Sequence, residues 1–177
     1  KFSKWFTDWN HDVLQRPNTQ MFIQDGRAFL RWSRTRYDVI IMEPMSPLQA
    51  GVVSLYSKEF YELALNHLKE DGILVQWLPL HLVGREDARS IASTFKNVFP
   101  ETSIWNSFLT RIVLLIGSRE KVFIDKNIFD ARLESPEIKK VAEEMKVMSF
   151  LDFADFFITD GNQLSAFLEG AEVISDD

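Results

Sequence analysis

Short apolar runs alternate with longer amphipathic stretches over the first two thirds of the chain. Three runs have the length and residue content of buried strands, at residues 21–23, 37–42 and 73–78. Three further segments repeat apolar positions at three- and four-residue spacing and predict helices, at residues 27–33, 58–68 and 85–98. Strands that alternate with helices in this way favour an α/β fold with a partial doubly wound, mostly parallel sheet.

The two ends of the chain have different patterns. Residues 2–14 carry apolar side chains at close to helical spacing and predict an N-terminal helix. Two closing strands, joined as an antiparallel hairpin, are predicted at residues 102–106 and 111–116. Beyond Ser118 we expect helices and no further strand, at residues 127–133, 137–146, 150–157 and 163–168. These patterns predict an α/β domain over residues 1–118, incomplete at its N-terminus, and a helical C-terminal appendage over residues 119–177.

The composition limits the classes of function. The chain has 177 residues, 46% of them hydrophobic, with 15 Phe and 5 Trp, so it can form a sizeable core and is not a disordered chain. A formal net charge of −6 argues against a nucleic acid bound through its phosphates. The absence of cysteine excludes disulfides and cysteine nucleophiles, and the three histidines are too scattered for a metal set. We therefore expect a globular domain with no metal and no nucleic-acid partner.

The sequence predicts neither a membrane span nor a secretion signal. No apolar run approaches the ~18–20 residues of a transmembrane helix, and no signal peptide is visible. The chain begins at Lys1 without Met, inside a predicted helix. We therefore expect a cytoplasmic location and a fragment of a longer protein.

A carboxylate follows the second predicted strand. Glu43 comes directly after residues 37–42. Pro44 and Pro47 prevent a helix from starting at once, so we expect a shaped loop, which also holds Ser46. A carboxylate there can orient and deprotonate an amine, which at a reference pKa of ~10.4 is otherwise protonated and not nucleophilic. The alternative interpretation is a solvated loop glutamate.

Polar groups also lie at the ends of the neighbouring predicted strands. Asp25 and Gly26 follow the first strand, where nucleotide-binding folds hold an adenine or a ribose; the alternative interpretation is an ordinary strand-to-helix turn. Gln76 lies near the end of the third strand, where it can hydrogen-bond a ligand or satisfy a neighbouring backbone group. Because the carboxyl ends of parallel strands meet at one edge of a sheet, we expect these residues to converge there with Glu43 and Ser46. No glycine-rich phosphate-binding motif is present.

Four short motifs follow the order found in one known family. They are DGR-x-FL at residues 25–30, YDVII at 37–41, S-x-EFY at 57–61 and DGI-x-x-Q at 71–76. Together they resemble the spermidine synthase-like family, the polyamine aminopropyltransferases, over most of residues 1–117. The stretches EPMSP-x-x-AGV, LYSKEFYELAL, QWLPL and the final GAEVISDD resemble more closely the subgroup fused to membrane transporter segments.

The resemblance implies a fold, a reaction and residue roles. The fold is that of S-adenosylmethionine-dependent methyltransferases. A polyamine nitrogen attacks the propyl carbon beside the sulfonium of decarboxylated S-adenosylmethionine, and methylthioadenosine leaves. Asp25, with Gly26, corresponds to the contact with the adenine, and Glu43 corresponds to the acid that activates the amine. Ser46 and Gln76 correspond to substrate contacts.

Two departures from the family pattern bear on activity. The family's acidic-Ser-Ser-Asp-Pro loop is replaced here by Glu-Pro-Met-Ser-Pro, so Ser46 stands where the second carboxylate is expected and recognition of a polycation is weakened. The family's glycine-rich loop and its ribose-binding acid precede the position of Lys1. We therefore expect the 177-residue chain alone to be inactive.

Other functions stay open at this point. One is a methyltransferase that uses S-adenosylmethionine itself, and another is a degenerate, non-catalytic domain of a larger protein. If the chain acts as the family does, its partner is a small-molecule polyamine. A homodimer, and a membrane segment attached in the parent protein, are compatible with the resemblance.

Overall fold

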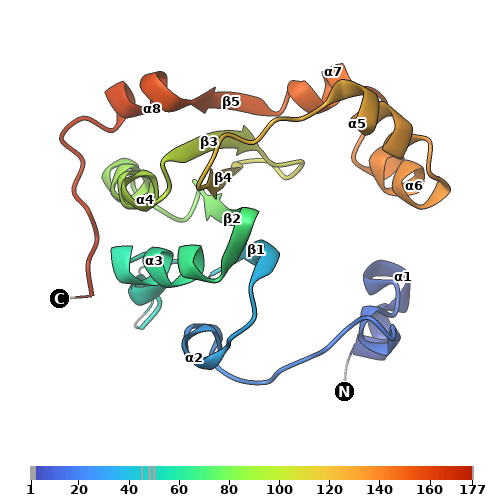
Figure 1. Ribbon diagram of the computed structural model, residues 1–177, viewed down its shortest axis with the longest axis horizontal. Coiled ribbons are helices and arrows are strands. Elements are labelled where there is room, and N and C mark those ends of the chain that lie inside the picture. The colour runs from blue at the N-terminus through green and yellow to red at the C-terminus, as the bar shows by residue number, and fades with distance from the viewer. Residues whose placement is uncertain (1–2, 45, 48, 50, 177) are drawn as a thin grey trace. The chain divides into compact units, whose positions relative to one another are not determined.

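The computed structural model describes residues 3–44, 46–47, 49 and 51–176 (Figure 1). The chain forms two compact units, Lys1–Trp32 and Ser33–Asp177, and each is described by itself. The larger unit contains the sheet and most of the helices.

The smaller unit begins with short helical turns in place of one long helix. These elements are η1 (Ser3–Phe6), α1 (Thr7–Asn10) and η2 (Val13–Gln15). The helix predicted over residues 2–14 is interrupted because His11 and Asp12 have positive φ angles of 49° and 52°. Residues in the left-handed region end a right-handed helix, so only short turns form on either side.

The predicted strand at residues 21–23 does not form. These residues have no strand partner in the described part of the chain, and Ile23 is 94% exposed. Phe22 packs on Phe29 of α2 (Gly26–Trp32), with the ring centroids 4.9 Å apart. Helix α2 confirms the helix predicted here. The strand prediction was wrong because a short apolar run forms no strand without a neighbouring ladder.

The larger unit is built on a five-stranded sheet with the order β1-β2-β4-β3-β5. Its strands are β1 (Tyr37–Met42), β2 (Leu68–Pro79), β3 (Glu101–Asn106), β4 (Ile112–Ser118) and β5 (Phe157–Asp160). β1 and β2 are parallel, whereas the pairs β2–β4, β4–β3 and β3–β5 are antiparallel. The α/β class and the predicted hairpin are confirmed, but the described sheet is mixed rather than mostly parallel. Antiparallel pairs prevail because β3 and β4 form the hairpin and β5 runs antiparallel to β3 at the edge of the sheet.

Strand β2 is longer than predicted. It begins at Leu68, and its ladder with β1 shifts register between the pairs Tyr37–Leu68 and Val39–Ile73. Gly72 lies inside this irregularity, where a Cβ atom would be 2.8 Å from the Tyr37 carbonyl oxygen. Glycine is required because the backbone of β1 approaches so closely. Asp71 and Gly72 therefore belong to an irregularity within one strand and not to a turn before it.

Two helices pack on one face of the sheet and form the core with it (Figure 1). α3 (Lys58–Asn66) and α4 (Arg85–Val98) confirm the two predicted crossover helices. Tyr61, Phe95 and Phe99 are fully buried between these helices and the sheet. The Phe95 ring centroid lies 5.1 Å from that of Tyr61 and 4.7 Å from that of Phe99. This aromatic cluster fixes both helices against the strands that carry the candidate site.

A methyl group at Gly117 is expected to destabilise the fold. A Cβ atom there would lie 2.5 Å from Phe99 Cγ and 2.6 Å from Phe95 Cε1, and both rings are fully buried. Gly117→Ala should therefore lower the free energy of unfolding by about 1–3 kcal/mol, measured by denaturant titration. Gly26→Ala is the matched control, because a Cβ atom there meets nothing within 4 Å. Equal stability of both variants would contradict the packing described.

The C-terminal part of the chain adds four helices and one strand. The helices are α5 (Lys126–Leu133), α6 (Pro136–Glu144), α7 (Phe150–Ala154) and α8 (Gly161–Phe167). The expectation of no strand beyond Ser118 was wrong, because β5 pairs with β3 over Ser103–Asp160, Ile104–Thr159 and Trp105–Phe157. Four residues are too few for an alternation to be recognised in sequence. The domain boundary predicted at residue 118 stays a prediction.

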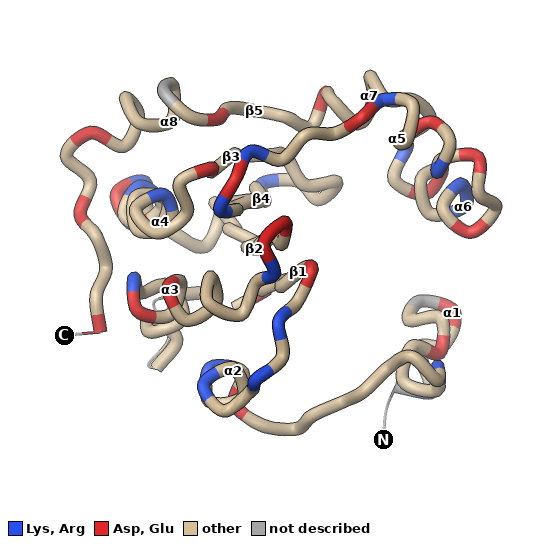
Figure 2. The backbone as a smooth tube through the Cα atoms, viewed as in Figure 1, with Lys and Arg blue, Asp and Glu red and all other residues tan. Residues whose placement is uncertain are grey.

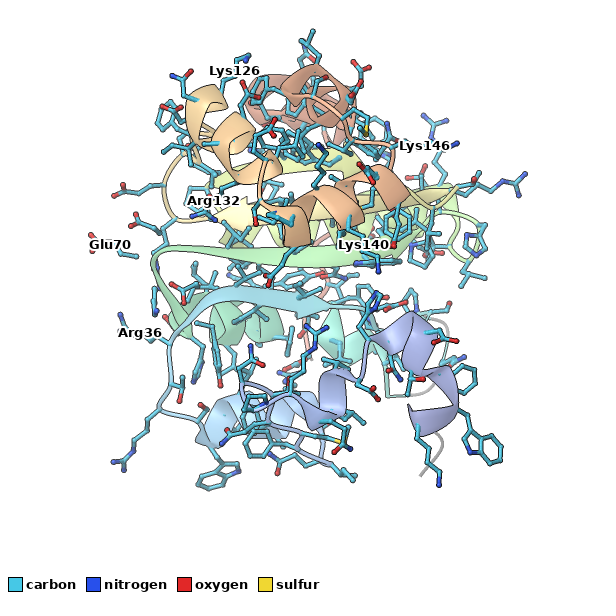
Figure 3. The ribbon with its side chains drawn as sticks, turned by 90° about the vertical axis from the view of Figure 1, so that its right-hand side faces the viewer. Arg36, Glu70, Lys126, Arg132, Lys140 and Lys146 are labelled. Carbon is cyan, nitrogen blue, oxygen red and sulfur yellow. The ribbon has the colours of Figure 1, made fainter. Side chains whose placement is uncertain are left out.

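Helices α5 and α6 present a charged outer surface of both signs. Lys126, Arg132, Lys140 and Lys146 extend outward from this region (Figure 3). Acidic residues alternate with them along the same two helices (Figure 2), and Lys126 forms an ion pair with Asp130 one turn away. Exposed charges of both signs keep this surface hydrated and do not select a ligand of one particular charge.

Candidate active site

Glu43 stands at the carboxyl end of β1, at the edge of the sheet. The last residue of β1, Met42, pairs with Gln76 of β2, so Glu43 lies level with the final residues of the neighbouring strand. The Glu43 side chain is exposed. A carboxylate at the carboxyl end of a parallel strand, open to solvent, can meet a ligand that enters from that edge.

The loop after β1 is a series of hydrogen-bonded turns. The backbone N–H of Gln49 donates to Ser46 O at 3.0 Å, that of Val52 to Gln49 O at 3.1 Å, and that of Leu55 to Val52 O at 2.9 Å. Ser46 Oγ also donates to the carbonyl oxygen of Leu82, at 3.4 Å. Because Leu82 follows β2, this contact joins the loops that leave the two parallel strands. The structure thus brings Ser46 and Glu43 to one edge with the end of β2.

Gln76, for which the sequence predicts a hydrogen bond to a ligand or to a neighbouring backbone group, lies inside the core. Its side chain is fully buried, and among the described residues neither Gln76 Oε1 nor Nε2 has a hydrogen-bond partner of regular geometry. The amide lies beside the hydroxyl of Tyr61, itself buried and without a partner of regular geometry. Burial raises the pKa of Tyr61 well above its ordinary value, Tyr56 adds to the rise, and the Gln76 amide opposes it. A substrate contact by Gln76 stays a prediction.

Asp25 caps helix α2. Its Oδ1 accepts the backbone N–H of Ala28 at 2.7 Å, and its carbonyl oxygen accepts that of Phe29 at 2.9 Å. Capping of this kind satisfies the free N–H groups of a first helical turn. Gly26 is the first residue of that helix. Both residues belong to the smaller unit, so their convergence with Glu43 stays a prediction.

Sequence reasoning missed how completely Ser57 is integrated. Ser57 is the N-cap of α3, because Ser57 Oγ accepts the N–H of Phe60 at 3.3 Å. The same oxygen donates to Ser54 O at 3.0 Å, and the residue is fully buried. Ser57 thereby joins the site loop rigidly to the helix. The sequence signal for this role is Ser54, three residues before Ser57, at the end of a turn-rich segment.

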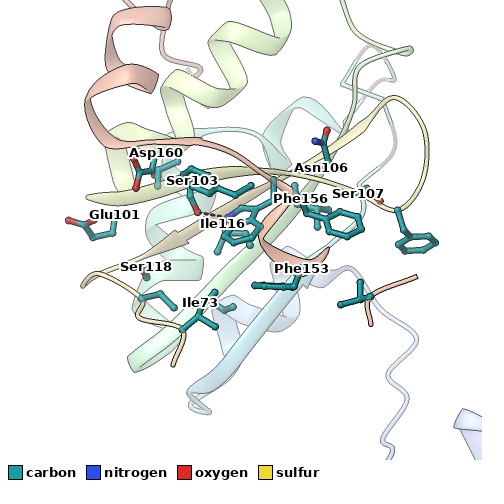
Figure 4. A pocket seen from close by; sticks show the side chains of 18 of the residues that line it. Ile73, Glu101, Ser103, Asn106, Ser107, Ile116, Ser118, Phe153, Phe156 and Asp160 are labelled. Carbon is teal, nitrogen blue, oxygen red and sulfur yellow. Dashed lines mark hydrogen bonds between the residues drawn. The ribbon is translucent and has the colours of Figure 1, made fainter. Parts of the chain in front are cut away.

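A cavity of about 610 Å³ lies against the other face of the sheet (Figure 4). Ile73 and Trp77 line it, whereas Leu74 and Gln76, which alternate with them along β2, are buried on the helix-covered face. Its walls are mostly apolar, from aliphatic and aromatic side chains, and Glu101 and Asp160 lie at one end. Glu43, Ser46 and Gln76 do not line it. The cavity is therefore separate from the candidate site.

Among the described residues, no group of three or more histidine or acidic side chains is arranged to hold a metal ion. Within the same residues, every helix is too short or too polar to cross a membrane.

Alkaline pH is expected to destabilise the protein through its two buried phenols. Burial raises the pKa of Tyr56 to about 12 and holds that of Tyr61 well above 10.0. The folded state keeps these protons where the unfolded chain loses them, so stability present below pH ~10 is lost as the pH rises toward ~12. Denaturant titrations on either side of pH ~10 measure this loss. The loss of stability should be smaller in Tyr56→Phe, and an equal loss would contradict its assignment to the buried phenols.

The chain is similar to proteins of one family in sequence. Residues 1–116 match the model of the spermine/spermidine synthase domain. Polyamine aminopropyltransferase 2 of Pseudomonas aeruginosa is 28% identical over 116 residues, covering 62% of this chain and 33% of that protein. The polyamine aminopropyltransferase of Saccharolobus solfataricus is 31% identical over 101 residues, covering 56% and 34%. The chain thus spans about a third of the length of these curated relatives.

Solved structures share the fold. A spermidine synthase in complex with the transition-state analogue AdoDATO aligns with a TM-score of 0.59 at 19% identity, over 82% of this chain and 57% of that one. Human methyltransferase-like protein 13 in complex with SAH aligns with a TM-score of 0.53 at 18% identity, over 82% and 65%. These likenesses confirm the expected methyltransferase-like fold. The transporter-fused subgroup stays a prediction.

Proposed function

The chain belongs to the spermine/spermidine synthase family, and on that premise we propose that the protein transfers an aminopropyl group from decarboxylated S-adenosylmethionine to a polyamine. One observation supports this proposal above the others. Glu43 is an exposed carboxylate at the carboxyl end of a parallel strand, where ligands bind in open α/β sheets. Its loop is anchored on both sides, through Ser46 to Leu82 and through Ser57 to α3.

The proposed chemical step needs a base more than it needs any other group. The acceptor nitrogen forms a bond to the propyl carbon while the carbon–sulfur bond breaks, and the electron pair of that bond leaves on sulfur as methylthioadenosine. The sulfonium loses its positive charge and the attacking nitrogen gains one. The acceptor amine is protonated in water, so it must lose one proton before it can attack. Glu43 takes that proton, which frees the nitrogen lone pair, and accepts a remaining N–H as a hydrogen bond so that the lone pair is directed at the propyl carbon. The secondary ammonium formed by the transfer can then lose its extra proton to water.

Two residues of the smaller unit are the proposed contacts of the co-substrate's nucleoside. Asp25 Oδ1 is committed to capping α2, and its carboxylate stays exposed, which suits a contact with the exocyclic amine of an adenine. Gly26 adds no side chain beside it, and a Cβ atom there would meet nothing within 4 Å. These two residues would hold the nucleoside, and Glu43 would serve the amine. Ser46 lacks the charge of a second carboxylate, so a polycationic acceptor is bound mainly through Glu43.

The ligand preference tests the proposal against ordinary methyl transfer. Thermal unfolding of the full-length protein should shift upward more with decarboxylated S-adenosylmethionine than with S-adenosylmethionine at equal concentration, because a ligand that binds the folded state raises its stability. A larger shift with S-adenosylmethionine would favour a methyltransferase. No shift with either compound would favour a non-catalytic domain.

A further inference from the structure

The last residues of the chain run across both helices that pack on the sheet. We call residues 169–176, which follow α8, the C-terminal strap. It descends from α8 past α4 and alongside α3 (Figure 1). Leu164 and Leu168, at 1% and 7% exposure, anchor the segment from which it leaves. The strap is thus held at its start by apolar burial.

Helix α4 holds the strap by side-chain hydrogen bonds. Arg89 donates from Nη2 to Glu169 O at 2.7 Å. Further along, Thr94 Oγ1 accepts the backbone N–H of Ile174 at 2.9 Å and donates to Ser90 O at 2.6 Å. Thr94 is fully buried, so both hydrogen bonds of this hydroxyl are made inside the protein. Loss of the acceptor would leave the Ile174 N–H without its partner, which is costly for a group removed from water.

The strap in turn holds the first turn of α3. The backbone N–H of Lys58, the first residue of that helix, donates to Ile174 O at 2.9 Å. The backbone N–H of Asp176 donates to Glu59 Oε2 at 3.0 Å. The first N–H groups of a helix have no partner within it, so the strap satisfies a donor that would otherwise need water. Ile174 therefore links α4 to the start of α3 through its N–H and its C=O.

The start of α3 is also the end of the candidate-site loop. Ser57, adjacent to Lys58, donates to Ser54 O, and Ser54 Oγ donates to Gly51 O at 3.1 Å. The turns that begin at Ser46 connect to the same segment. Fixing Lys58 thus fixes the carboxyl end of the loop whose other end carries Glu43.

We propose that Thr94 is a positioning residue for this site, because it holds the C-terminal strap against the first turn of α3 and so fixes the loop that bears Glu43 and Ser46. The catalytic half of this inference, that Thr94 supports turnover at the site, rests on the proposed function. The mechanical half, that the strap protects the backbone of residues 51–58, does not, and it predicts this protection whether or not the protein is an enzyme.

Hydrogen exchange of the full-length protein tests the mechanical half. Thr94→Val keeps the shape of the side chain and removes the acceptor, so amides of residues 51–58 should exchange about 2- to 10-fold faster, as expected for one lost hydrogen bond. Thr94→Ser keeps the oxygen and should restore slow exchange. Thr110→Val makes the same substitution at an exposed threonine and should change nothing. Amides of β4 report global stability and should accelerate less in Thr94→Val than those of residues 51–58, because the lost hydrogen bond belongs to the strap and not to the sheet.

A second variant removes the other half of the link. Lys58→Pro deletes the N–H that donates to Ile174, while proline is well tolerated at the first position of a helix and after an extended residue such as Ser57, with φ −79° and ψ 155°. It should reproduce the faster exchange of residues 51–57, and Lys58→Ala should not. Exchange that stays slow in both Thr94→Val and Lys58→Pro, or that rises equally in β4, overturns the inference.

Activity separates this inference from the proposed function. In an active protein, Thr94→Val should lower kcat with little change in co-substrate affinity, and Thr94→Ser should restore it. Faster loop exchange with unchanged kcat would overturn the catalytic half of the inference. Faster loop exchange in a protein that transfers no aminopropyl group would support the mechanical half and overturn the proposed function alone.

Discussion

If the proposed function holds, replacing Glu43 with Gln is expected to lower the turnover number of the full-length protein by about 10²–10⁴-fold, the range typical for loss of a general base. Glutamine keeps the size and hydrogen-bonding oxygen of the side chain but cannot take the proton from the attacking amine. The co-substrate affinity should be nearly unchanged, because the proposed function assigns Glu43 to the acceptor and not to the nucleoside. Steady-state kinetics and a direct binding titration measure the two quantities.

The matched control for this variant is Glu70→Gln. Glu70 is also an exposed glutamate, but it lies in the irregular start of β2, away from the carboxyl ends of the strands. Its turnover should equal that of the wild type. An unchanged rate in Glu43→Gln would make Glu43 an ordinary loop residue, and loss of binding together with rate would assign it to the nucleoside.

Replacing Phe95 with Ala is expected to lower the free energy of unfolding by about 3–5 kcal/mol, the cost of emptying a fully buried aromatic site. The ring packs between Tyr61 and Phe99 and also faces Gly117, so its removal opens a cavity bounded by two helices and the sheet. Denaturant titration measures the loss. Most of it should appear as a lower midpoint, because the unfolded chain is little changed.

Phe123→Ala is the control for Phe95→Ala. The Phe123 side chain is 83% exposed, and its one described ring contact is with the Lys121 ammonium, 5.9 Å from the ring centroid. Exposed cation–π contacts contribute about 0.5–1 kcal/mol, so this variant should lose no more than that. Similar losses in the two variants would contradict the location of the core.

Elements with strong local patterns could be predicted from the sequence. The strand at residues 37–42 and the helix at 85–98 were located within their observed bounds, since each has one dominant period and clear flanking residues. The prediction of a strand at residues 21–23 was wrong because an apolar run forms a strand only when a neighbouring strand supplies hydrogen bonds. β5 was missed for the opposite reason: its pairing with β3 comes from a contact distant in the chain, and four residues carry little pattern.

Some features of the candidate site could likewise be predicted from the sequence, and others could not. That Glu43 and Ser46 follow the carboxyl end of a strand could be predicted, because the run before them is strongly apolar and the prolines after it exclude a helix. That Gln76 faces the core beside Tyr61 could not, since the direction of a side chain depends on the strand's register with its neighbours. The contact of the C-terminal strap with α3 joins residues far apart in the chain and leaves no local signal.

Product analysis tests the central claim most directly. The full-length protein is incubated with decarboxylated S-adenosylmethionine and a polyamine, and in a parallel reaction with S-adenosylmethionine and the same polyamine. The proposed function predicts methylthioadenosine and aminopropylated amine in equal amounts in the first reaction, and no methylated amine in the second. Methylated product with S-adenosylmethionine, or no methylthioadenosine above the level given by Glu43→Gln, would contradict it.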